Sequence, residues 1–111
     1  MKNFLAIYLG SADANAKMEI ADAQKRAGMD KWMKWVTDNA GAIVDVGSPL
    51  GKTKKINAGG VSDTKNRMTA YTIVKADSQE DAARLFVNHA HFTVFPGDSV
   101  EVMECLPIPG M

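Results

Sequence analysis

The sequence predicts one α+β domain over residues 1–111, with the ferredoxin-like order β-α-β-β-α-β. Two observations predict it. Short segments rich in β-branched and aromatic residues alternate with longer segments whose apolar residues recur at helical spacing. The order of these segments is that of a four-stranded antiparallel sheet with both helices on one face. At this length a chain buries roughly two-thirds of its surface, so a core can form without disulfide bonds.

Each predicted strand is rich in Val, Ile, Tyr, Phe or Thr and is bounded by turn-forming residues. The predicted strands are residues 2–9, 42–46, 68–76 and 99–106. The second strand stops at the turn Gly47-Ser-Pro-Leu-Gly51. Residues 50–65 then form a polar, glycine-rich excursion, with a short strand at 54–57 and a turn at 58–60. Residues 107–110 are expected to be an extended tail, because proline cannot continue a strand ladder.

The first helix is predicted over residues 14–40. Its apolar face follows the spacing i, i+3, i+4, i+7 and i+11, and consists of Met29, Trp32, Met33, Val36 and Ala40. Ser11 or Asp13 is expected to cap its start. Gly28 is expected to divide it, and Gly41 is expected to end it at the C′ position.

The second helix is predicted to begin at Asp77-Ser78 and to end at residues 88–91. Ser78 and Asp81 have the spacing of a capping box, with Asp in place of the usual Glu or Gln. Its apolar face consists of Ala82, Leu85 and Phe86.

The strands predict that the sheet face without helices is covered by a second copy of the chain. A face open to water would show apolar and polar residues in alternation. Residues 2–9 instead carry apolar side chains on both parities: Leu5, Ile7 and Leu9 on one, and Phe4, Ala6 and Tyr8 on the other. Four such strands would expose more apolar surface than monomers usually leave open. We therefore expect a two-fold symmetric homodimer packed sheet to sheet.

Four polar side chains are expected among the apolar residues of that second face. They are Tyr8, Asp45, Tyr71 and Glu101. Carboxylates and phenols in an apolar setting are typical of a small-ligand cavity, and equally of a wet dimer interface.

Charge and cysteine content exclude several classes of protein. Thirteen basic and thirteen acidic residues cancel, so neither nucleic acid nor an anionic membrane is an expected partner. No apolar run reaches the roughly 20 residues that span a bilayer, and no signal-peptide cleavage pattern follows the N-terminus. The one cysteine, Cys105, excludes a disulfide framework and is expected to be buried in the last strand. We expect a cytoplasmic protein without a bound cofactor or metal.

His89 and His91 are the candidate acid/base groups, because histidine changes its charge near neutral pH. Asp45 or Asp30 is the expected partner. The alternative is that both imidazoles only interact with the last carbonyls and the dipole of a helix. A metal site needs three or four ligands, and His-x-His supplies only two.

The candidate ligand-binding residues are Tyr8, Trp32, Ser48 and Tyr71. The simpler interpretation makes Trp32 and Trp35 core or dimer contacts, and makes Ser48 a turn residue.

Five stretches, in this order and spacing, resemble the YCII-related family of the dimeric α/β-barrel superfamily. They are Gly47-Ser-Pro-Leu-Gly51, Gly59-Gly60, Tyr71-Thr-Ile-Val-Lys-Ala-Asp-Ser78, Asn88-His-Ala-His-Phe92, and Ser99-Val-Glu-Val102 with the closing Pro-Ile-Pro-Gly-Met. The segment Trp32-Met-Lys-Trp35 is similar to one branch of the family. The resemblance covers nearly the whole chain. It implies a ferredoxin-like subunit, a homodimer, and a cleft between the first helix, the loop after the second strand and the end of the second helix.

The resemblance also implies an acid/base dyad from which this sequence departs. Relatives place a His on the first helix near the Asp of an Asp-Pro pair after the second helix. Here the first helix has Asp30 and Trp32 near that place, and the Asp-Pro position holds His89-Ala90 or Ala90-His91. Either the roles are exchanged, with Asp30 or Asp45 orienting His89, or the dyad is lost.

Three functions remain open at this point. The chain could be a cofactor-free small-molecule enzyme that uses His89 or His91 with Asp45 or Asp30. It could bind a small molecule in the same cleft without turnover. It could also be a partner-binding module in which residues 50–65 carry recognition.

Overall fold

The structure is a computed structural model that describes residues 1–10 and 21–110. The strands are β1 (Lys2–Leu9), β2 (Ile43–Asp45), β3 (Thr53–Asn57), β4 (Gly60–Thr64), β5 (Met68–Ala76) and β6 (Ser99–Glu104). The helices are α1 (Asp22–Asp38), α2 (Gln79–Arg84) and α3 (Ala90–Thr93). None of the described helices is long and apolar enough to cross a membrane.

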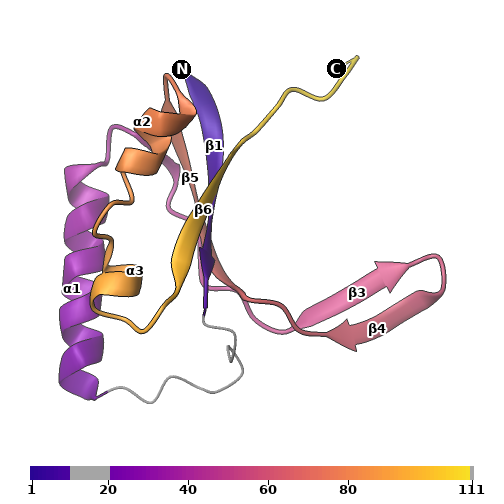
Figure 1. Cartoon of the computed structure of the whole chain (residues 1–111), viewed down its shortest axis with the longest axis horizontal. Coiled ribbons are helices and arrows are strands. Elements are labelled where there is room, and N and C mark those ends of the chain that lie inside the picture. The colour runs from indigo at the N-terminus through magenta and orange to yellow at the C-terminus, as the bar shows by residue number, and fades with distance from the viewer. Residues whose placement is uncertain (11–20, 111) are drawn as a thin grey trace.

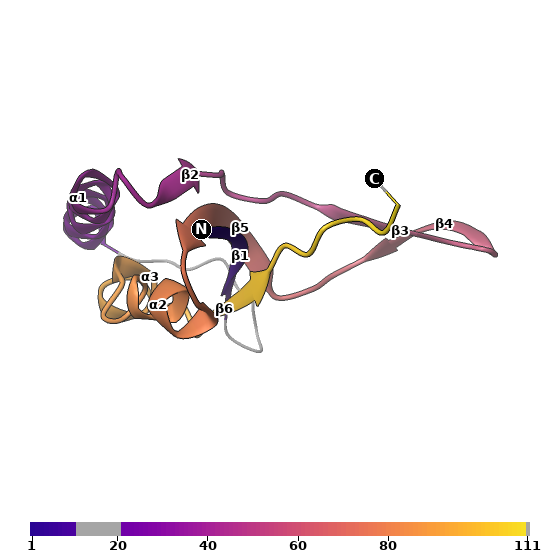
Figure 2. The same cartoon turned by 90° about the horizontal axis from the view of Figure 1, so that it is seen from above.

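The predicted fold class is confirmed. The main sheet is antiparallel, with strand order β2-β5-β1-β6. All three described helices lie on one side of this sheet (Figures 1 and 2). β1 and β5 occupy the predicted residues, because their density of β-branched and aromatic side chains is high from end to end.

The core lies between the helices and the central strands β1 and β5. Alternate residues of both strands point into it, and the most deeply buried are Phe4, Ala6, Tyr8, Thr72 and Val74. Trp32 and Trp35 of α1 are partly buried against this cluster, which confirms their interpretation as core residues. Burying one large apolar side chain contributes about 1.5–3 kcal/mol, so these two strands and α1 hold the domain together.

The bounds of α1 differ from the prediction. Ser11, Asp13 and most of the predicted first turns lie outside the described residues, and the helix begins at Asp22. Gly28 does not divide the helix. It is buried within it because the ring of Phe95 packs there, and a Cβ atom at Gly28 would lie 2.5 Å from that ring. The helix is capped by Asn39, not ended by Gly41.

The second predicted helix is two helices. Ser78 caps α2 as expected, and its Oγ accepts a hydrogen bond from the Asp81 N–H at 3.1 Å. However, α2 ends at Arg84, and Asn88 has a left-handed φ of 60°, which no α-helix continues through. His89 then caps the start of α3, so the prediction of a helix end at residues 88–91 is wrong.

The excursion after β2 is a projecting β-hairpin, which we call the arm (β3 and β4). Its first strand was predicted, and its second strand was not. Ile56 pairs with Val61 near the tip. The arm leaves the body on the side opposite the helices, and the C-terminal tail extends on the same side (Figure 2). β6 ends at Glu104, so Cys105 lies beyond the strand and is exposed, not buried as expected.

The other face of the sheet carries no helix from the described residues. Leu5, Ile7 and Leu9 are half-buried there, and Ile7 stands opposite both Tyr71 and Glu101. The expectation that Tyr8 shares this face is wrong, because Tyr8 points to the helices and is fully buried. Both parities of β1 are apolar, so the sequence could not indicate which one faces the helices.

Candidate functional site

A cavity of about 460 Å³ opens between α1, the loop after β2, the start of β5, and α3 with the turn that follows it. Its lining residues are Met29, Trp32, Met33, Val46, Gly47, Ser48, Pro49, Thr69, Ala70, Tyr71, His91 and Phe95. None of these residues carries a full charge when histidine is neutral. Met29 and Met33 are about half exposed and stand one helical turn apart, so two flexible thioether side chains border the cavity.

His91 brings an imidazole to this apolar wall. The ring is buried, and its Nε2 atom lies 2.7 Å from the carbonyl oxygen of Leu9. A carbonyl only accepts, so Nε2 carries the proton and the neutral ring keeps its lone pair on Nδ1. Burial lowers the pKa of His91, while the backbone at Leu9 and Ser99 and the charge of Asp98 partly offset this effect. His91 is therefore mainly neutral at pH 7.

Gly97 holds the His91 ring from the other side. Its N–H donates to the His91 carbonyl at 2.9 Å. A Cβ atom at this position would overlap the Cε1 and Nε2 atoms of the ring. The Leu9 carbonyl also accepts from the Asp98 N–H at 3.0 Å, so the end of β1 fixes both the imidazole and the turn that follows it.

His89 lies behind the cavity wall and shapes α3. Its Nδ1 accepts a hydrogen bond from the His91 N–H at 2.9 Å, so Nε2 carries the proton of the neutral ring. Among residues 1–10 and 21–110, Nε2 of His89 has no hydrogen-bond partner. The ring instead packs between Trp32 and Trp35, with centroid distances of 4.4 and 4.8 Å.

The electrostatics of His89 follow from this packing. Burial, then the charges of His91 and Lys31, lower the pKa of His89 to about 4. His89 is thus neutral at physiological pH. It acts at the N-terminus of α3, and not at the carbonyl end of a helix as the alternative interpretation supposed.

A buried hydrogen-bond chain positions the loop after β2. Thr72 Oγ1 donates to the Val46 carbonyl at 2.9 Å, so it accepts from the Tyr8 hydroxyl, also at 2.9 Å. Burial raises the pKa of Tyr8 to about 12, and the Thr72 contact lowers it in part. Tyr8 is not among the lining residues of the cavity. It is a support for the cavity wall.

The same loop depends on a glycine. Gly47 has φ +78°, and a Cβ atom there would overlap the carbonyl of Tyr71. Asp45 Oδ1 accepts from the Gly47 N–H at 2.8 Å, which is an Asx turn. Beyond it, the Ser48 carbonyl accepts from the Tyr71 N–H at 3.4 Å. The loop is thereby held against β5.

The structure brings together Trp32, Ser48, Tyr71 and His91 as lining residues of one cavity. It does not bring the predicted carboxylates to them. Asp30 is exposed on α1, and Asp45 is exposed in the turn. Within the described ranges, no carboxylate is hydrogen-bonded or ion-paired to either imidazole. The catalytic and ligand-binding roles of all these residues stay predictions.

The sequence analysis missed three groups at the site. Phe95 and Gly97 follow α3, and their importance comes from close packing that leaves no signal in a single sequence. Asp98 is the carboxylate whose charge acts on His91, and it forms an ion pair with Arg67 at 2.8 Å. The only sequence feature that hints at a role for Asp98 is its position directly after Gly97.

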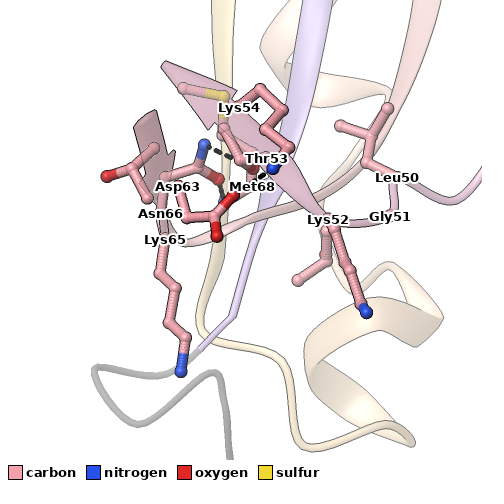
Figure 3. Close-up of a pocket in the computed structure, with 11 residues that line it drawn as sticks. Leu50, Gly51, Lys52, Thr53, Lys54, Asp63, Lys65, Asn66 and Met68 are labelled. Atoms are coloured by element: carbon pink, nitrogen blue, oxygen red, sulfur yellow. Dashed lines mark hydrogen bonds and ion pairs between the residues drawn. The ribbon is translucent and has the colours of Figure 1, made fainter. Parts of the chain in front are cut away.

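A second, wider cavity of about 680 Å³ lies at the base of the arm (Figure 3). Its lining is polar, and Lys54 is ion-paired with Asp63. In Figure 3 the side chains of Lys52 and Lys65 extend apart, so no cluster of free cations forms there. In the described part of the chain, no group of three or more His, Cys, Asp or Glu could hold a metal ion. The cavity beside His91 is therefore the better candidate site.

The fold and this site define a ferredoxin-like α+β protein with an aromatic cavity beside α1 and α3. No protein-family model and no curated protein sequence matches the chain. Among solved structures, it is similar to 5-chloro-2-hydroxyhydroquinone dehydrochlorinase (TftG) from Burkholderia phenoliruptrix, in complex with 2,5-dihydroxybenzoquinone. The two share 14% identity over 93% of this chain and 91% of that chain, with a TM-score of 0.51. This likeness shows the shared fold.

Proposed function

We propose that the chain binds a small, planar, uncharged molecule in the cavity beside His91. The observation that carries the proposal is a neutral imidazole in the wall of a cavity that no charged side chain lines. An anion there would lose its hydration without gaining a cation, which costs several kcal/mol. The volume lies within the ordinary range of ligand pockets, roughly 300–1,000 Å³. The ligand of the structural neighbour, 2,5-dihydroxybenzoquinone, is a small ring and supports the same size class.

In the catalytic form of this proposal, Nδ1 of His91 accepts a proton from a weakly acidic group of the bound molecule. The imidazolium that forms is favoured by the backbone at Leu9 and Ser99 and by the Asp98 carboxylate, since each raises the pKa of His91. No cofactor is needed for such a proton transfer. Asp98 supplies here what Asp30 or Asp45 was expected to supply.

Binding without turnover is the second candidate function. It is favoured by one observation: among the described residues, neither imidazole is held by a carboxylate, as the base of a typical dyad is. His89 is engaged as a helix cap, which removes it from acid/base chemistry. Membership of the YCII-related family, which the sequence resemblance implies, is compatible with either form of the proposal.

We also propose that the chain forms a homodimer through the sheet face on which no described helix packs. Half-buried Leu5, Ile7 and Leu9 lie there beside Tyr71 and Ile73. In a dimer with a two-fold axis, each copy would cover this sheet face of the other copy. Light scattering at micromolar concentration should then give twice the mass of one subunit.

The binding proposal is tested with two probes of the same shape and different charge. 1-Naphthol is neutral at pH 7, and 1-naphthoate is an anion. We expect 1-naphthol to bind at least about tenfold more tightly in calorimetry or thermal-shift assays, because the cavity offers the carboxylate no partner. Trp32→Leu should weaken 1-naphthol binding, while the control Leu106→Ala, outside the cavity, should not. Equal affinity for the two probes, or binding unaffected by Trp32→Leu, would contradict the proposal.

Turnover is separated from binding with His91→Gln, which keeps the polarity and the approximate volume of the ring. If His91 is a base, the wild type should accelerate deuterium uptake from D2O at the α-carbon of 2-indanone, a nearly planar neutral ketone, measured by NMR, and His91→Gln should not. Acceleration that is identical in both proteins would remove the catalytic form. The same 1-naphthol affinity in both would then leave the binding form in place.

A further inference from the structure

The arm carries an apolar pair near its tip that the described residues leave exposed. Ile56 and Val61 form a cross-strand pair, and the two side chains are 71% and 69% exposed. Because side chains alternate along a strand, Lys54 and Asp63 lie on the same face, while Lys55 and Ser62 point the other way. This face of the arm therefore carries one exposed apolar pair beside one ion pair.

The arm is also poorly supported for a two-stranded unit. Isolated hairpins are marginally stable in water, and packing against another surface is what usually stabilises them. The described body supplies little such packing, because the arm projects away from it into open space (Figures 1 and 2). The molecule measures 48 × 37 × 18 Å along its principal axes, which reflects this projection.

The direction of the arm indicates what it contacts. It projects on the side of the sheet where none of the described helices lies, next to the face with half-buried Leu5 and Ile7 (Figure 2). Anything that packs on this face therefore lies beside the arm. Each strand of the arm has five residues and reaches about 17 Å, and the four-stranded sheet is about 14 Å wide between its outer strands.

Area and charge both favour a second copy of this chain as the occupant. The sheet face covers on the order of 400 Å², whereas a standard stable interface buries about 800 Å² per partner. The arm can supply the remaining area. Residues 50–65 carry four lysines against one aspartate, while Glu101 of the outer strand β6 stands opposite Ile7 on the sheet face away from the described helices. An arm of one copy beside β6 of another would bring opposite charges together.

We infer that the arm embraces a second copy of the chain, with Ile56 and Val61 packed on the partner's sheet near β6. The inference rests on the proposed homodimer and adds to it a specific contact. In a two-fold assembly each copy gives one arm and receives one, so a single association covers both exposed apolar pairs.

The test is the dimer dissociation constant, measured by sedimentation equilibrium over 0.1–100 µM (about three decades, chosen to bracket ordinary affinities). We expect Ile56→Ser/Val61→Ser to raise the dissociation constant at least about tenfold. Lys55→Arg/Ser62→Ala changes the neighbouring pair on the opposite face while keeping its charge, and it should leave the constant within about threefold. All four side chains are exposed, so circular dichroism should show an unchanged fold in both variants.

A second measurement follows the arm directly. Amide hydrogen exchange of residues 53–64 should slow in the wild type as the dimer fraction rises, and it should not do so in Ile56→Ser/Val61→Ser. A dimeric wild type whose arm exchange is independent of concentration, or whose dissociation constant the apolar variant leaves unchanged, would overturn the embrace and leave pairing through the sheet intact. A monomeric wild type at 100 µM would overturn both. Loss of 1-naphthol binding alone would affect neither.

Discussion

The wall of the cavity and the arm are opposite solutions to the problem of holding a short element. In the wall, α3 has only four residues, yet His89, Phe95 and His91 tie it to the core, to α1 and to β1. In the arm, two five-residue strands are tied mainly to each other. The wall is complete within one chain, and the arm is not. The residues of the wall stabilise the fold of a single chain, whereas the apolar residues of the arm remain exposed until another surface packs on them.

The largest effect is expected where the wall leaves no room. Gly47→Ala should destabilise the domain by about 3 kcal/mol or more, because the new Cβ atom meets the Tyr71 carbonyl and the residue must keep φ +78°. Gly51→Ala is the matched control, since nothing lies within 4 Å of a Cβ atom there. Urea denaturation of both variants measures the contrast. Two variants of equal stability would show that the loop after β2 is free to move.

A smaller effect on stability is expected from pH, and it should arise from His89 in the cavity wall. The pKa of His89 is lowered from 6.5 to about 4, so the unfolded chain binds a proton between these values and the folded chain does not. The contribution of His89 to the free energy of unfolding is therefore present above pH 6.5, and it is lost as the pH falls toward 4. We expect a loss of about 2 kcal/mol between pH 7 and pH 5. His91 acts in the same direction.

The matched variant is His89→Gln, which cannot titrate. It should be less stable than the wild type at pH 7, yet its stability should vary much less from pH 7 to pH 5. Thermal denaturation at each pH measures both quantities. An equally steep loss in His89→Gln would mean that other groups carry the acid sensitivity.

The smallest effect is expected in the arm. In dilute solution, where the chain is monomeric, Ile56→Ser/Val61→Ser should change the stability of the body by less than about 0.5 kcal/mol, since exposed substitutions seldom do more. Denaturation followed by the fluorescence of Trp32 and Trp35 reports on the body alone. A large loss would indicate that the arm packs on its own chain, and the contrast between the two regions would disappear.

Local sequence patterns predicted much of the fold and less of the candidate site. β1 and β5 could be placed to the residue, and the Ser78 cap was visible, because each rests on side-chain types within a few positions. β4 was missed because Gly60-Val-Ser-Asp-Thr64 is as polar as a loop. Its pairing with β3 supplies a stability that composition does not show.

The site depended on contacts distant in sequence. The left-handed Asn88 broke an apparently continuous helix, and the Leu9 carbonyl set the tautomer of His91 from 82 residues away. Asp45 looked like a catalytic carboxylate, although its neighbour Gly47 makes it a turn former. Residue type alone cannot separate these two roles, because both use the same oxygen atoms.

The ring of Phe95 seated on Gly28 has a consequence for how this molecule can vary. The helix α1 cannot shift along its axis, because a shift of one turn, about 5.4 Å, would place a larger side chain against the Phe95 ring in place of Gly28. Met29, Trp32 and Met33 are thereby held at one height above the sheet. An insertion or deletion between Gly28 and Met29 would rotate these three residues together about the helix axis, so we expect length changes to be tolerated in the arm long before they are tolerated there.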